Sequence, residues 1–105
     1  MTIKVLAIGD IGNILHTIRK YTKKSKIHIV NFYKDGAGEY TYTDDIETFQ
    51  TYKVTDHVKR INEIKDDFDI CITMGTGERI AYLSDLNYAT FYVGRDIDAP
   101  RFIKN

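Results

Sequence analysis

The sequence predicts one α/β domain built on a parallel β-sheet with helices on both faces. Short, nearly unbroken apolar runs alternate along the chain with segments whose apolar residues recur at helical spacing. A fully buried parallel strand has the first pattern, and an amphipathic helix that packs on a sheet has the second. A chain of 105 residues is enough for one such core but too short for two ordinary domains. We therefore expect a single domain over residues 1–105.

The first third of the chain predicts a β-α-β unit. Residues 3–9 form a short apolar run that ends at a glycine, as expected of a central parallel strand. Over residues 14–25 the apolar side chains recur at helical spacing, which predicts a helix whose apolar stripe faces the sheet. A second apolar run at residues 27–32 follows almost at once, so we expect it to return as a second parallel strand.

The middle of the chain is less regular. Residues 33–45 combine turn residues with a brief tyrosine and threonine alternation, which predicts a long loop and leaves a short edge hairpin open. Residues 48–54 are rich in β-favouring side chains and predict a third strand. Thr55 and Asp56 can then cap a second helix, in which apolar residues recur over residues 58–68.

The last third repeats the alternation. Residues 69–74 form an apolar strand that ends in a glycine-containing turn, and helical spacing resumes over residues 80–86. Residues 88–93 form a fifth strand, and residues 94–105 have turn composition. Strands and helices that alternate in this way predict a three-layer, Rossmann-like α/β domain with a parallel five-stranded sheet in the order 3-2-1-4-5.

This strand order places the first and fourth strands side by side. The crossover direction reverses between them, so a crevice opens at their carboxyl ends, where ligands bind in such sheets. Loops with glycines border the crevice on both sides, and each leads into a helix N-terminus whose free amides can hold an anion. The alternative is that these glycines only bend the chain. The candidate substrate-binding residues are Gly9, Asp10, Gly12 and Asn13 in the first loop, and Gly75, Thr76, Gly77 and Glu78 in the second.

Asp10 carries two expectations. It follows the first strand, where catalytic carboxylates often sit in such folds, as Asp96 and Asp98 follow the fifth. Most loop aspartates cap turns instead, and Asp10 also lies near the expected cap of the first helix. Both roles stay open at this point.

Several common sites are absent from the sequence. A dinucleotide fingerprint needs the spacing GxGxxG, whereas Ile11 and Ile14 occupy the positions of its second and third glycines. No acidic residue ends the second strand, no GxxxxGK[ST], CxxC or HExxH pattern occurs, and the three histidines lie on different elements. We therefore expect no cofactor and no metal site. His16 is expected to be an ordinary, partly exposed helix residue, and His57 a surface residue.

Charge and composition limit the partners. Fifteen basic residues balance fifteen acidic ones, so nothing favours general nucleic-acid binding. The clearest basic cluster, residues 19–26, is expected to be a solvated helix end, with contact to anionic lipid or substrate as the alternative. Cys71 lies in an apolar run and should be a buried, inert thiol. A lone cysteine, no run long enough to span a membrane and a start directly in a strand predict a cytoplasmic protein.

Three segments carry a family resemblance. They are Lys4-Val5-Leu6-Ala7-Ile8-Gly9-Asp10, Phe68-Asp69-Ile70-Cys71-Ile72-Thr73-Met74-Gly75 and Tyr92-Val93-Gly94-Arg95-Asp96-Ile97. Together they resemble the N-terminal lobe of GT-B glycosyltransferases of the group-1 type, and the last is similar to the strand and Gly-x-Asp-Ile loop of that group. The resemblance covers nearly the whole chain.

The resemblance implies transfer of a sugar from a nucleotide-sugar donor, with this lobe shaping the acceptor side and a second Rossmann lobe binding the donor. In that family the donor lobe carries the Glu-x7-Glu pattern that holds the nucleotide sugar, and these 105 residues account for one lobe only, so the isolated domain is expected to be inactive. By the same resemblance, residues 9–13 would face the donor phosphates, and residues 75–78 with Arg95 and Asp96 would line the acceptor side. No catalytic residue is assigned.

Two other functions stay open. The first is a stand-alone binding or regulatory module of flavodoxin-like shape, which would hold a small anionic ligand in the same crevice. The second is a structural or dimerising domain, which the tyrosine-rich segment at residues 33–52 suggests, so a homodimer also stays open.

Overall fold

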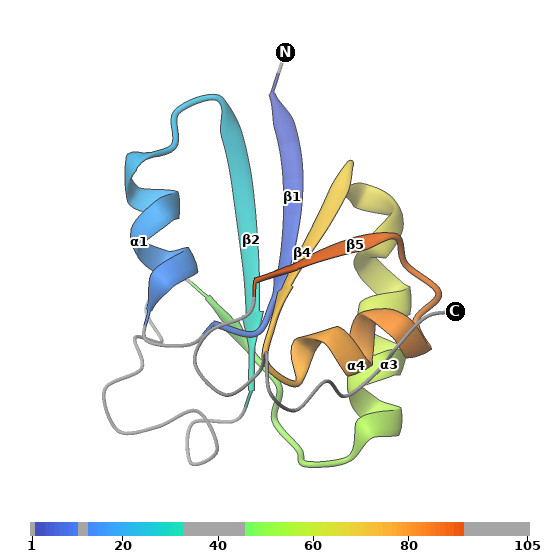
Figure 1. Cartoon of the computed structure of the whole chain (residues 1–105). Coiled ribbons are helices and arrows are strands. Elements are labelled where there is room, and N and C mark those ends of the chain that lie inside the picture. The colour runs from blue at the N-terminus through green and yellow to red at the C-terminus, as the bar shows by residue number, and fades with distance from the viewer. Residues whose placement is uncertain (1, 11–12, 33–45, 92–105) are drawn as a thin grey trace.

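Five strands and three α-helices lie within residues 2–10, 13–32 and 46–91, the parts of the chain that the computed structural model describes (Figure 1). The predicted loop at residues 33–45 and the segment at residues 92–105 lie outside them. A 3₁₀ turn, Lys65–Asp67, links the second of these helices to the fourth strand. In chain order the elements are β1 (Ile3–Ile8), α1 (Ile14–Tyr21), β2 (Ser25–Asn31), β3 (Glu47–Thr48), α3 (Val54–Ile64), β4 (Ile70–Met74), α4 (Gly77–Leu83) and β5 (Tyr88–Phe91).

The strands form one sheet in the order β3-β2-β1-β4-β5, and every neighbouring pair is parallel. β1 lies at the centre, where Val5 is in register with Ile27 of β2 on one side and Ile70 of β4 on the other. This confirms the predicted α/β, Rossmann-like fold and its strand order. The order follows from the alternation of strands and helices, because parallel neighbours need crossovers of one hand.

The two faces of the sheet carry separate cores, because successive side chains of a strand point to opposite faces. α3 and α4 cover one face, and α1 lies on the other (Figure 1). Leu6, Ala7 and Ile8 of β1 have no exposed surface, as expected of a strand that is covered twice. The α3/α4 core contains Leu6, Ile8, Val30, Phe49, Ile61, Cys71, Ile80 and Ala81, and the α1 core contains Ala7, Leu15, Ile29 and Met74.

The prediction of a third strand over residues 48–54 is wrong in length and position. Only Glu47 and Thr48 pair with β2, and Val54 already begins α3. Phe49 still donates its amide to the Asn31 carbonyl at 2.9 Å, but its ring is buried against the α3/α4 core. Thr51 then donates its hydroxyl to Asp56 at 2.9 Å, which helps to form the turn into α3. Local β propensity is thus overridden by packing and by side-chain bonds to the turn.

Two other expectations need adjustment. α1 ends at Tyr21 rather than near residue 25, because Thr22 is already extended and β2 begins at Ser25. Helices were expected on both faces of the whole sheet, but on the α1 face they do not cover β4 and β5. Ile70 of β4 and Phe91 of β5 are 50% and 45% exposed on that face, so no described helix packs on them there.

Candidate functional site

The two predicted glycine loops meet at the carboxyl ends of β1 and β4. Gly9 has a φ of +86°, and a Cβ there would overlap the Met74 carbonyl at the end of β4. A Cβ on Gly77 would overlap the carbonyl oxygen of Ile8 at the end of β1. Backbone therefore packs directly on backbone at this point. Glycine is needed because a side chain at Gly9 would collide with the end of β4, and one at Gly77 would push α4 away from the end of β1.

Asp10 is buried at 5% exposure, and its carboxylate caps α1. Oδ1 accepts the Leu15 amide at 2.8 Å, and Oδ2 accepts the His16 amide at 3.1 Å. These are among the helix amides that have no partner within the helix, and a carboxylate beside them also complements the helix dipole. The predicted capping role is therefore confirmed. A bound anion would have to compete with Asp10 for both of these amides.

Asn31, at the end of β2, fixes the backbone of Asp10. Its Oδ1 accepts the Asp10 amide at 3.1 Å and the Phe32 amide at 2.9 Å, while Nδ2 donates to the Asp10 carbonyl at 3.3 Å. The side chain is only 2% exposed, so its bonds are not shared with water. Sequence reasoning missed this residue because it looked only for an acidic group at the end of β2.

The second loop begins α4 beside a pocket. Gly75 has a φ of +56°, and Glu78 in the first turn of α4 is buried at 4% exposure. Thr76 and Arg79 line the pocket, so this loop brings two polar side chains to it. Asn13 immediately precedes α1 with left-handed backbone angles and does not line the pocket. Gly12, Arg95 and Asp96 lie outside the described residues.

This pocket, which we call the edge pocket, lies past the carboxyl ends of β2, β3 and β4, on the α3/α4 side of the sheet. Its volume is about 280 Å³, near the lower end of the range for small-molecule sites. Four lining side chains are aromatic or aliphatic, and four carry polar groups. They are Phe32, Tyr52, Val54 and Ile80, and Thr51, His57, Thr76 and Arg79, respectively.

The prediction that His57 is a surface residue is wrong, because the ring is 6% exposed. It stacks on Phe49 with ring centroids 4.1 Å apart and meets the Phe32 ring edge-on. Nε2 lies 2.7 Å from the Thr51 carbonyl, which can only accept, so Nε2 carries a proton. Nδ1 is buried and has no hydrogen-bond partner among the described residues. The signal was present in the sequence, since His57 precedes Ile61 and Ile64 at helical spacing.

No family model, curated protein or solved structure matches this chain. Within residues 2–10, 13–32 and 46–91, no group of three or more histidine, cysteine, aspartate or glutamate side chains could hold a metal ion. In the same residues, no helix is long and apolar enough to cross a membrane.

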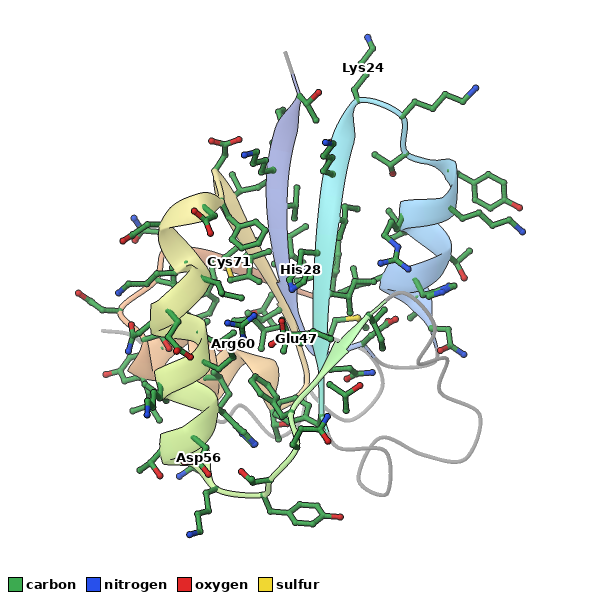
Figure 2. All side chains as sticks on the ribbon, turned by 180° about the vertical axis from the view of Figure 1, so that it is seen from behind. Lys24, His28, Glu47, Asp56, Arg60 and Cys71 are labelled. Carbon is green, nitrogen blue, oxygen red and sulfur yellow. The ribbon has the colours of Figure 1, made fainter. Side chains whose placement is uncertain are left out.

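A charged group outside the edge pocket ties β3 to α3. Arg60 of α3 donates Nε and Nη2 to the two carboxylate oxygens of Glu47, at 2.7 and 2.8 Å, and His28 of β2 lies 3.2 Å from Oε1 (Figure 2). The bond from Arg60 lowers the pKa of Glu47, with a further contribution from His28 against the opposing effect of burial. Glu47 in turn raises the pKa of Arg60. The geometry indicates a structural link that compensates for the two-residue length of β3.

Cys71 of β4 is buried in the α3/α4 core, as predicted (Figure 2). Burial raises the pKa of its thiol to about 12, so almost none of it is thiolate at neutral pH. Cys71 does not line the edge pocket.

Proposed function

We propose that this chain is the acceptor-side lobe of a two-lobed glycosyltransferase of the GT-B type, in which a second Rossmann-like lobe outside these 105 residues holds the nucleotide-sugar donor. The observation that carries the proposal is the position of the edge pocket. It lies at the carboxyl edge of the sheet, beside the β1–β4 switch point, where ligands bind in open parallel sheets.

The pocket chemistry suits one part of a sugar-like ligand. Phe32 and Tyr52 offer apolar surface for the face of a ring, and Thr76 and Arg79 offer groups for hydroxyl or anionic substituents. In this proposal residues 75–78 contact the acceptor through the Thr76 side chain. The first loop stabilises the fold, because the Asp10 carboxylate caps α1.

Fold alone does not support a particular activity, since many functions share this architecture. A direct test is to titrate the isolated chain with a panel of methyl glycosides and nucleotide sugars while following backbone amides by NMR. We expect saturable shifts at Thr76, Arg79 and His57 with at least one glycoside, and no sugar transfer by the chain alone. Robust turnover by the isolated chain would refute the division of labour between two lobes.

A matched pair of variants tests whether the edge pocket is the site. Arg79→Gln should weaken the glycoside-induced shifts, whereas Lys59→Gln removes the same charge from an exposed position of α3 outside the pocket and should not. If the whole panel leaves the amides of the edge pocket unchanged, the pocket has no part in acceptor binding.

A second candidate is a stand-alone binding module for a small anionic ligand. The observation that favours it is the Arg79 guanidinium, a cation that lines the edge pocket beside Thr76. Inorganic phosphate and simple carboxylates discriminate between the two proposals. Saturable shifts at residues 75–78 with these anions, and none with glycosides, would support the binding module over the acceptor lobe.

A further inference from the structure

The charge of this chain is unevenly distributed, although its total is zero. Residues 13–31, which contain α1 and β2, hold five lysines and arginines and no acidic residue. The rest of the chain therefore holds ten basic residues (15 − 5) and all fifteen acidic ones. The segment that forms α1 and β2 is therefore strongly cationic.

Four exposed lysines gather where α1 ends and β2 begins, at the amino edge of the sheet. We call Lys20, Lys23, Lys24 and Lys26 the basic end. Figure 2 shows Lys24 projecting from the turn between α1 and β2. None of these four lysines forms an ion pair with another described residue. Asp66, Asp67 and Asp69, which precede β4, also lie near the amino edge. Asp67 lines a pocket there together with Lys26, whereas Lys20, Lys23 and Lys24 do not line that pocket.

Large apolar side chains are exposed beside these lysines. Tyr21 and Ile18, both in the last turn of α1, are 73% and 40% exposed, and Ile3 at the start of β1 is 44% exposed. The Lys20 ammonium lies over the Tyr21 ring, 5.7 Å from its centroid. A merely solvated helix end needs no such side chains, whereas aromatic and aliphatic residues next to lysines suit the boundary between lipid headgroups and acyl chains.

We propose that the basic end and its apolar neighbours Ile18, Tyr21 and Ile3 bind the surface of an anionic lipid bilayer. A cluster of at least four lysines has the charge that anionic headgroups attract, and here Lys20 lies in the last turn of α1 while the other three follow it. A nucleic acid would pair with the lysines but would leave the isoleucines unburied. β1 and β2 run from this edge toward the edge pocket, so a membrane-bound domain would keep its pocket away from the bilayer. The inference does not depend on the proposed function.

A fluorescent variant tests the contact directly. The chain contains no tryptophan, so Tyr21→Trp introduces a single indole at the most exposed of the three apolar side chains of the surface. Its emission should shift to the blue on vesicles of phosphatidylcholine with about one third phosphatidylglycerol, and brominated acyl chains should quench it. Pure phosphatidylcholine vesicles, inorganic phosphate and a short DNA duplex should leave the emission unchanged. A shift with DNA and none with the anionic vesicles would overturn the proposal in favour of a nucleic-acid surface.

Two matched charge reversals locate the binding surface in the otherwise unchanged chain. Lys23→Glu with Lys24→Glu should lower the vesicle partition constant, measured by co-sedimentation with the anionic vesicles, by about 25-fold or more. The reason is that each lysine near the membrane surface raises this constant by about five-fold. Lys53→Glu with Lys59→Glu makes the same change in net charge at exposed positions near α3, and it should have a much smaller effect. Circular dichroism checks that both variants are folded. Equal losses in the two variants would show that net charge, and not this surface, drives binding.

Discussion

The most informative single substitution is Asp10→Ala, because it separates a structural role from a catalytic one. The carboxylate makes two hydrogen bonds to α1 amides, at 2.8 and 3.1 Å, from a position that is 5% exposed. Alanine removes both acceptors and leaves the Leu15 and His16 amides without a partner. Leu15 is itself buried at 1% exposure, so water reaches that amide poorly.

The expected cost follows from the two bonds. Hydrogen bonds to a charged group contribute about 1.5–3 kcal/mol each, and loss of a helix cap costs about 0.5–2 kcal/mol. Because the two figures describe overlapping interactions, we expect a total loss of about 3 kcal/mol. For a domain of this size that corresponds to a fall in Tm of roughly 12–20 °C. Asp10→Asn keeps one acceptor oxygen and should fall between alanine and the wild type.

Urea unfolding followed by far-ultraviolet circular dichroism measures both variants. Asp66→Ala, an exposed aspartate in the turn before β4, is the matched control and should change stability by less than about 0.5 kcal/mol. A gain in stability for Asp10→Ala would refute the capping role of Asp10. Such a gain is typical of a residue that is kept for activity at the expense of folding stability.

Three further predictions concern packing, pH and reactivity. Gly77→Ala should destabilise the fold by about 3 kcal/mol in urea unfolding because its methyl group would overlap a β1 carbonyl, whereas Gly75→Ala, at a φ of +56°, should cost about 1 kcal/mol. The folded-state pKa of Glu47 is lowered from its ordinary value of 4.5. The ionised carboxylate therefore contributes to the free energy of unfolding above pH 4.5, and this contribution is lost as pH falls through the lowered pKa. The difference in free energy of unfolding between the wild type and Glu47→Gln, measured in urea, should therefore shrink in acid. Arg60→Met should remove most of that pH dependence. A difference that stays the same from neutral to acid pH would show that the ion pair is not formed. Cys71 should not react with a thiol reagent at neutral pH until urea unfolds the chain, because burial raises its pKa to about 12, and rapid labelling of the native protein would contradict this.

Much of the fold was predictable because its determinants are local and repeat. Each buried strand is a short apolar run, each helix has one apolar stripe, and right-handed crossovers then restrict the strand order to few choices. The loops that meet between β1 and β4 were predictable for the same reason, since the strand order alone makes those two ends neighbours. The cap role of Asp10 was one of two open roles, and only the positions of Leu15 and His16 separate them.

The errors share one cause. Residues 48–54 have β propensity, but Phe49 is held by the α3/α4 core and Thr51 by the turn into α3, so the strand stops at Thr48. His57 is polar and was assigned to the surface, yet stacking on Phe49 and a bond to the Thr51 carbonyl hold it inside. In each case a partner outside the residue's own element determines its environment.

The sequence by itself determined the parallel α/β fold and the strand order 3-2-1-4-5, because periodicity and crossover handedness depend only on the order of apolar and polar residues along the chain. The tertiary structure alone decided which polar side chains line the edge pocket. The Asp10 carboxylate, which the sequence placed in the crevice, caps α1, while Thr76, Arg79 and His57 line the edge pocket. The reason is that a polar group is placed by the partners it finds in three dimensions, and these partners lie on elements that are distant in the sequence.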